Sequence, residues 1–408
     1  MKKFGIFVPL LFIYILFILL VASDSLIHDE PRYLQFADNI THGFYSAKDN
    51  IDLTNPPLYP LVLSPFVALG SPLIIPRLLN ALFLFLALCV FYMTLLFNMK
   101  KKAAVILTYI LGLFPLHFLW LHLLLTESLA ILLLCLFMYS LSSLMMDTPG
   151  KSKHLFWAGL FLAMLAMTKV IFGYVIMAGL LITFFLFLVR RSHKIRKLLL
   201  VLFLAFLFCL PYLTYTGILT GNIFYWGTNG GETLYWMSSP YPDEYGDWIK
   251  FEKVLEKEWI PQVYERHGDF FKKLEPLSRF ERDKLFREKA YENIRSNPTK
   301  YIQNWVSNMG RLLFNYPNSY SPQTVAKYYV LFPNMILIIL SLFCLYPSIK
   351  KRESIPFEIH TLYILALVYL GGSSLVSSLV RYLLIVVPIF VLWIGYIFTQ
   401  VIQIEFKE

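Results

Sequence analysis

The stretch "FGIFVPLLFIYILFILLVASDSLIHDEPRYL" (residues 4–34) joins a long apolar run directly to the acidic cluster His28-Asp29-Glu30. A helix that crosses a bilayer needs about 20 predominantly apolar residues, so the run predicts a first membrane span. Its apolar core is longer than the roughly 7–15 residues of a signal peptide, which favours an uncleaved anchor. The acidic cluster is then either a solvated loop beside this anchor or the start of an active site at the membrane surface.

The composition identifies a membrane protein before any motif is considered. Of the 408 residues, 58% are hydrophobic and 15% are charged, whereas soluble chains carry about 25% charged residues. The net charge of +10 does not indicate a nucleic-acid partner, because the basic runs lie in short loops between apolar segments and no nucleic-acid-binding motif is present. The four cysteines all lie inside apolar runs, so we expect no disulfide framework and no thiolate metal cluster.

The chain is predicted to be an all-α polytopic membrane protein with about ten transmembrane helices. A further apolar piece, 58–69, is too short to span and is interrupted by Pro60 and Pro65. The predicted spans are 4–22, 74–97, 103–120, 124–145, 154–168, 171–189, 198–217, 328–346, 358–376 and 381–400.

The basic loops predict the orientation, because Lys and Arg accumulate on the cytoplasmic side of membranes. With the N-terminus inside, the basic segments that fall inside are "MKK" (1–3), "NMKKK" (98–102), "GKSKH" (150–154), "RRSHKIRK" (190–197) and "SIKKRES" (348–354). We therefore expect both termini to lie in the cytoplasm. We expect the membrane to be the plasma membrane or the inner membrane of the cell. Residues 23–73 and 218–327 then face outward.

Three parts are predicted from this topology. Residues 1–217 form an N-terminal transmembrane module with the first outer loop, and residues 328–408 form C-terminal transmembrane helices. Residues 218–327 mix acidic and basic side chains at helical spacing, with opposite charges three and four residues apart. We expect this outer segment to fold into several short helices over the outer ends of the spans.

Ionisable residues from five segments converge on the outer face. Such residues near membrane depth are candidates for a functional site. Structural explanations stay open for each: Asp29 and Glu30 could start a helix over 30–42, Lys169 could snorkel to the surface, and Arg381 could anchor the last span. The groups are Asp29 and Glu30 in the first loop, Arg77, the set His117, His122 and Glu127, Lys169, and Arg381.

The order of several short motifs resembles the GT-C superfamily of integral-membrane glycosyltransferases. The motifs are an Asp-Glu pair followed by "PRY" after the first span, "NPPLYP" (55–60), "TK" (168–169) between two central spans, and "RYLLIVVP" (381–388) at the start of the last span. The branch that the chain resembles contains dolichyl-phosphate-mannose protein mannosyltransferases and the bacterial aminoarabinose transferases, and is similar to glycosyltransferase family 39.

The resemblance implies an enzyme that takes a sugar from a polyprenyl-phosphate donor outside the membrane. Asp29 takes the place of the catalytic aspartate, and Lys169 and Arg381 take the places of residues that hold the lipid phosphate. Aminoarabinose transferases usually have Lys where this chain has Asn55, so aminoarabinose is not the sugar we expect. Further candidates are Glu30 for catalysis, Arg77 for phosphate, and Tyr33, Asn55, Glu127 and Tyr382 for contacts with donor or acceptor.

The chemistry of these residue types fits a hexosyl- or pentosyl-type transfer. An acceptor hydroxyl is a poor nucleophile at neutral pH, so a carboxylate such as Asp29 must take its proton. The anionic leaving phosphate needs fixed cations. A divalent metal ion is an open possibility, with ligands that could come from Asp29, Glu30, His117, His122 and Glu127.

Other function classes stay open. The chain could be a flippase or transporter of a lipid-linked sugar, although we detect no internal repeat of the kind common in transporters. It could be a ligase that moves a whole lipid-linked oligosaccharide, or a non-catalytic assembly subunit. The sugar is not determined by the sequence, and the acceptor could be a lipid, a glycan or a protein.

Overall fold

The computed structural model describes residues 4–146, 151–322 and 324–402, and every regular element in these ranges is a helix. The basic residues 1–3 and the start of the 150–154 loop, both predicted to be cytoplasmic, lie outside the described residues. Each of the ten predicted spans coincides with a helical segment. The all-α class is therefore confirmed.

The N-terminal half contains ten α-helices after the short turn η1 (Gly5–Phe7). They are α1 (Val8–Val21), α2 (Glu30–Thr41), α3 (Leu58–Ala68), α4 (Ile74–Leu95), α5 (Lys101–Gly112), α6 (Leu116–Trp120), α7 (Glu127–Met145), α8 (Lys151–Ala166), α9 (Ile171–Arg190) and α10 (His193–Thr220). The C-terminal helices are α16 (Val325–Lys350), η2 (Arg352–Ser354), α17 (Phe357–Ser374), α18 (Arg381–Tyr396) and η3 (Ile397–Val401).

Seven helices in the described ranges are long and apolar enough to cross a membrane. They are Ile74–Leu95, Lys101–Trp120, Glu127–Met145, Ile171–Arg190, His193–Thr220, Lys327–Lys350 and Arg381–Val401. Two further predicted spans are shorter apolar helices, Gly5–Val21 and Ser152–Ala166. The remaining predicted span, 358–376, corresponds to α17. The apolar piece that was expected to be too short to span is the 11-residue helix α3.

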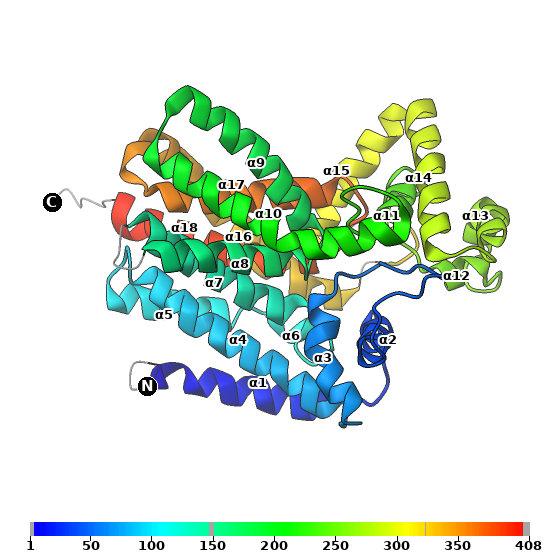
Figure 1. Cartoon of the computed structure of the whole chain (residues 1–408), viewed down its shortest axis with the longest axis horizontal. Helices are drawn as coiled ribbons and strands as arrows, with labels where there is room; N and C mark the ends of the chain where they lie inside the picture. The colour runs from blue at the N-terminus through cyan, green and yellow to red at the C-terminus, as the bar shows by residue number, and fades with distance from the viewer. Residues whose placement is uncertain (1–3, 147–150, 323, 403–408) are drawn as a thin grey trace.

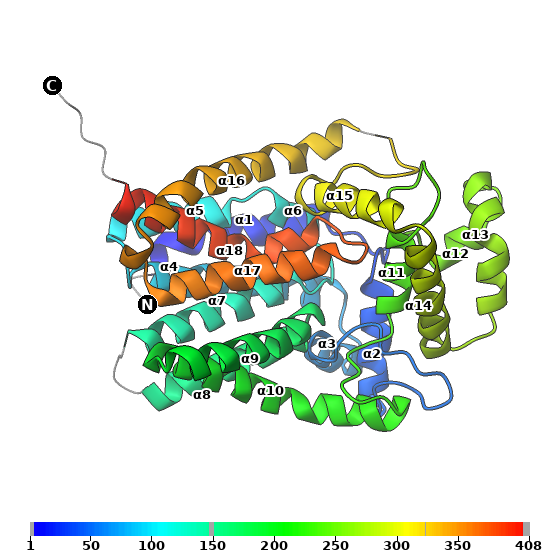
Figure 2. The ribbon, with the colours of Figure 1, turned by 90° about the horizontal axis from the view of Figure 1, so that it is seen from above.

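Helices α7 and α18 form the protein-facing interior of the bundle. The apolar windows of α7 and α18 are 89% and 78% buried, whereas those of α9 and α16 are only 28% buried and present large apolar side chains outward. Viewed from above, α7, α17 and α18 lie between α16 on one side and α8, α9 and α10 on the other (Figure 2). The first turns of α7 and α18 therefore begin helices that are mostly buried within the protein.

The two chain ends lie at one end of the bundle, and the segment after α10 lies at the other (Figure 1). The turns α4–α5, α9–α10 and α16–α17, which carry the basic loops, lie toward the same end as the termini (Figure 1). This arrangement agrees with basic loops on one membrane side. Which side faces the cytoplasm stays a prediction.

The segment between α10 and α16 folds into five short helices, as expected from its charge spacing. They are α11 (Gly230–Met237), α12 (Phe251–Leu255), α13 (Pro261–Leu274), α14 (Arg279–Ser296) and α15 (Pro298–Phe314). The Ser278 side chain caps α14 and Glu281 bonds back to the Ser278 backbone, which satisfies N–H groups at the helix start. Aromatic residues such as Trp236, Phe271 and Phe286 give this segment its own hydrophobic cluster.

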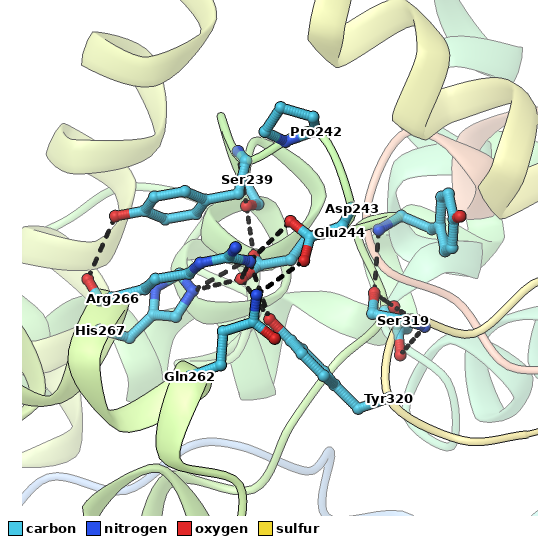
Figure 3. A network of polar contacts seen from close by, with 12 residues as sticks. Ser239, Pro242, Asp243, Glu244, Gln262, Arg266, His267, Ser319 and Tyr320 are labelled. Atoms are coloured by element: carbon cyan, nitrogen blue, oxygen red, sulfur yellow. Dashed lines mark hydrogen bonds and ion pairs between the residues drawn. The ribbon is translucent and has the colours of Figure 1, made fainter.

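A buried carboxylate, Glu244, ties the loop after α11 to α13 and to residue 320 (Figure 3). It accepts hydrogen bonds from His267 Nε2 at 3.0 Å, Arg266 Nη1 at 3.2 Å and Tyr320 OH at 2.5 Å, and another from Ser239. Burial alone would raise the pKa of Glu244, but the hydrogen bond and charge of His267 hold it below its ordinary value. The carboxylate therefore acts as the ionised centre of this network.

We expect Glu244→Ala to destabilise the outer segment by about 3–5 kcal/mol, because it leaves buried donors without an acceptor. Asp243→Ala is the matched control, since Asp243 pairs with the same Arg266 at 2.7 Å but is 49% exposed. An exposed pair contributes at most about 1 kcal/mol. The urea dependence of protease cleavage within 218–327 measures both variants, and equal stability of the two would contradict the structural role of Glu244.

Candidate active site

The first loop places Asp29 at the start of α2 but directs its carboxylate away from that helix. Asp29 is the N-cap residue of α2, yet its side chain accepts no capping hydrogen bond from the helix backbone. His28, just before it, has a φ of +55°, in the left-handed region that non-glycine residues adopt infrequently. The carboxylate thus does not serve as a helix cap, which was one of the two roles that the sequence left open.

Both oxygens of Asp29 are held by arginines. Oδ1 lies 2.7 Å from Nη2 of Arg32, and Oδ2 lies 2.6 Å from Nη2 of Arg381. Burial alone would raise the pKa of Asp29, but the charges of Arg381 and Arg32 outweigh it and hold the pKa well below its usual range. Asp29 is therefore an ionised, well-oriented carboxylate.

The ion pairs continue from Asp29 to a second carboxylate and a lysine. Arg381 Nε lies 3.7 Å from Glu127 Oε1, and Lys169 Nζ donates to the same Glu127 oxygen at 2.8 Å. The side chains of Arg381 and Lys169 are each 12% exposed, and that of Glu127 is 3% exposed. Four distant segments thus meet in one alternating row of charges: Arg32, Asp29, Arg381, Glu127 and Lys169.

Two polar atoms in this row of charges lack a hydrogen-bond partner in the described part of the chain. Among the described residues, Nε of Arg381 and Oε2 of Glu127 are buried polar atoms that lack a hydrogen-bond partner. Buried polar groups in folded proteins are almost always paired, and exceptions concentrate at functional sites. The row therefore has hydrogen-bonding capacity that an anion or a hydroxyl group could use.

Polar and aromatic neighbours fix the geometry of the row. Asn55 Oδ1 accepts from Arg32 Nε at 2.5 Å, and Asn55 Nδ2 donates to Tyr33 OH at 3.0 Å. The ring of Tyr382 lies 5.5 Å from Lys169 Nζ, a cation–π contact. Tyr33, Asn55, Glu127 and Tyr382, the predicted contact residues, all adjoin the row. Arg32 was not among the predicted site residues, although its spacing three residues after Asp29 was a usable signal.

Glu30 and Arg77 are occupied elsewhere. Glu30 is completely buried: Oε1 accepts from Arg77 Nη2 at 3.0 Å and from the Leu124 backbone N–H at 2.9 Å, and Oε2 accepts from the Ile27 N–H at 2.9 Å. Arg77 is 2% exposed and also donates to the Ser23 carbonyl. This pair joins α2, α4 and the turn before α7. Neither side chain is exposed here, and the predicted roles of Glu30 in catalysis and of Arg77 in phosphate binding stay predictions.

The residues named as possible metal ligands do not form one group in the described structure. In the ranges that the structure describes, no three His, Cys, Asp or Glu side chains form a group that could hold a metal ion. His117 is buried, with Nε2 at 3.0 Å from the Leu111 carbonyl, and His122 packs against Phe17. The set proposed from the sequence, Asp29, Glu30, His117, His122 and Glu127, is therefore not a metal centre in this arrangement.

We expect Glu30→Gln to lower the free energy of unfolding by about 3–5 kcal/mol, because it leaves the buried Arg77 charge without its counter-ion. Asp24→Asn is the control in the same loop; Asp24 is exposed, so its change should stay within about 0.5 kcal/mol. Thermal unfolding in detergent compares the two. A Glu30→Gln protein as stable as the Asp24→Asn protein would show that the Glu30–Arg77 pair does not hold the first loop.

Comparisons with known proteins give a family match over part of the chain. Residues 54–215 match the family described as dolichyl-phosphate-mannose-protein mannosyltransferase. This range contains Asn55, Glu127 and Lys169, whereas Asp29 and Arg381 lie outside it. A search of curated proteins gave no match.

Two solved structures similar to this chain are of ArnT from Cupriavidus metallidurans. The one bound to undecaprenyl phosphate is 14% identical with a TM-score of 0.44, over 95% of this chain and 77% of the other. The apo structure is 12% identical with a TM-score of 0.44, over 98% and 78% of the two chains. The family match confirms the resemblance of this chain to the GT-C superfamily of membrane glycosyltransferases.

Proposed function

We propose that this protein transfers a single sugar from a polyprenyl-phosphate donor to an acceptor hydroxyl, on the outer face of the cell membrane. The observation that carries the proposal is the position of the Asp29 carboxylate, 2.6 Å from Arg381 and linked through Arg381 and Glu127 to Lys169 by three successive ion pairs. A base beside two cations is what glycosyl transfer from a lipid phosphate requires. The match of residues 54–215 to a family of lipid-phosphate-dependent mannosyltransferases supports the same reaction class.

Asp29 is the general base of the proposed reaction. An acceptor hydroxyl attacks the anomeric carbon, its proton passes to a carboxylate oxygen of Asp29, and the bond to the phosphate oxygen breaks. Glu127 is nearly buried and paired with both Lys169 and Arg381, which suits it to hold the cations rather than to attack the sugar. We therefore propose a single displacement with inversion at the anomeric carbon, since among the described residues we identify no second carboxylate placed as a covalent nucleophile.

Lys169 and Arg381 bind the donor phosphate in this proposal. Both begin or precede helices at the same end of the bundle, and Arg381 retains a buried Nε without a hydrogen-bond partner in the described chain. A planar guanidinium can bind phosphate through two parallel hydrogen bonds. The lipid tail stays in the bilayer while its head group meets these cations at the surface.

Donor binding also releases the base. In the unliganded protein Asp29 is a weak base, because Arg32 and Arg381 keep its pKa low. A phosphate that draws Arg381 toward itself frees Oδ2 of Asp29 and places a negative charge nearby, and both changes raise the pKa of Asp29. The carboxylate becomes basic only when the leaving group is in place, which protects the donor from premature hydrolysis.

We expect Asp29→Asn to fold and insert normally but to lose transfer by about 10²–10⁴-fold, the usual contribution of a general base. The assay reconstitutes protein in vesicles with labelled polyprenyl-phosphate sugars and measures polyprenyl phosphate release together with sugar transfer. Asp38→Asn is the control, since Asp38 is an exposed acid on the same helix, 57% exposed. Near-wild-type transfer by Asp29→Asn at equal abundance would rule Asp29 out.

The same vesicles separate the competing functions. Movement of intact donor across the bilayer without release of polyprenyl phosphate would indicate a flippase or transporter. Transfer of an entire oligosaccharide in preference to a single sugar would indicate a ligase. Absence of all three activities with every donor would indicate an assembly subunit.

Removing a phosphate-binding cation should weaken use of the donor. For Lys169→Met and Arg381→Met we expect the donor KM to rise about 10- to 100-fold, because a hydrogen bond to a charged group contributes about 1.5–3 kcal/mol. Lys100→Met removes an exposed lysine near the opposite end of the bundle and should leave the KM unchanged. An unchanged donor KM in both site variants would contradict the phosphate assignment.

A further inference from the structure

An open cleft of about 350 Å³ lies in the outer segment, between the chain around α12 and the loop at 318–321. Its lining includes three aromatic side chains, Trp248, Trp259 and Tyr320. Polar groups of different kinds stand beside them: the Asp247 carboxylate, the Asn318 amide and the Lys250 ammonium. Small-molecule sites characteristically combine aromatic walls with a few polar groups of this sort.

The ring of Trp259 is available to a ligand. Trp259 is 42% exposed although it is a large apolar ring, and an indole can cover an apolar face while its N–H stays wet. Saccharides present flat faces of C–H groups edged by hydroxyls, so they stack on such rings and hydrogen-bond to neighbouring amides and carboxylates. The combination of groups therefore suits a sugar ring.

The cleft is built on rigid supports. Tyr320 donates to the buried Glu244, and Asp247 accepts from the Ser319 N–H at 3.0 Å and also from the Ser319 hydroxyl (Figure 3). Arg311 Nη1 ties the two sides together, through the Tyr245 carbonyl at 2.7 Å and the Pro317 carbonyl at 3.2 Å. A preformed site loses little conformational entropy when a ligand binds, and this favours binding.

Lys250 connects the cleft to the catalytic loop. Its side chain is exposed and lines the cleft, so its charge can meet a ligand. Its charge also reaches His28, the residue before Asp29: burial lowers the pKa of His28 most, Arg381 lowers it further, and Lys250 adds to this effect against the opposing charge of Asp29. One lysine of the cleft therefore interacts electrostatically with the residue next to Asp29.

We propose that this cleft is the acceptor subsite and that the acceptor is a saccharide, bound by stacking on Trp259. The proposal rests on the glycosyltransferase function proposed above. It narrows the acceptor from a lipid, a glycan or a protein to a glycan. A lipid acceptor without sugar would not need aromatic walls beside an amide and an ammonium. A protein acceptor is an outcome that the test distinguishes.

The test measures binding of purified full-length protein in detergent to an array of defined immobilised oligosaccharides. We expect the wild-type protein to be retained by at least one saccharide, and Trp259→Ala to weaken that binding at least tenfold. Trp259→Phe should restore most of it, because the ring face is kept. Trp157→Ala is the matched control, since Trp157 lies on α8 with a similar exposure of 44%, and it should bind as the wild type does.

Asp29→Asn separates the failure of this inference from the failure of the proposed function. It should lose transfer but retain saccharide binding, because Asp29 lies outside the cleft. No retained saccharide, or equal binding by Trp259→Ala and the wild type, overturns the saccharide cleft even if Asp29-dependent transfer persists. Retention of immobilised peptides in place of saccharides also overturns it, in favour of a protein acceptor.

Discussion

The arrangement of this protein depends on the pairing of charges at the ends of apolar helices. An ionised group at this depth costs several kcal/mol unless a partner compensates it. Asp29, Arg381, Glu127 and Lys169 compensate one another, since Asp29 lies between Arg32 and Arg381 and Glu127 lies between Arg381 and Lys169. The same pairing that permits these charges to exist near the bilayer also brings the proposed base and the two cations proposed to bind phosphate to one place.

The packing around the row makes it precise enough for chemistry. Glu127 and Arg381 begin α7 and α18, the spanning helices whose apolar windows are 89% and 78% buried. The buried Glu30–Arg77 pair holds the first loop against α4 and the turn before α7. The two adjacent acids therefore differ in their contacts. Glu30 forms a buried structural ion pair, whereas Asp29 pairs with arginines that we propose a ligand can displace.

Much of this could be predicted from the sequence, and the rest depends on contacts that spacing does not encode. Apolar runs of sufficient length gave the helices, and topology brought Asp29, Lys169 and Arg381 to one end because each follows or opens a span. Which acid would be buried could not be predicted, since Asp29 and Glu30 are adjacent and the difference arises from Arg77 and the Leu124 backbone. The Glu244–His267 contact joins residues 23 positions apart in a loop and a helix, with no periodicity to indicate it.

The central claim is that donor phosphate draws Arg381 from Asp29 and thereby makes Asp29 a base. The pH dependence of transfer tests it directly, because kcat/KM for the donor reports the free enzyme and kcat reports the donor complex. Activity falls as the pH drops through the pKa of the base, and that pKa is well below its usual range in the free protein. The account predicts that the acid limb of kcat lies at higher pH than the acid limb of kcat/KM. Acid limbs at the same pH in both profiles would contradict it.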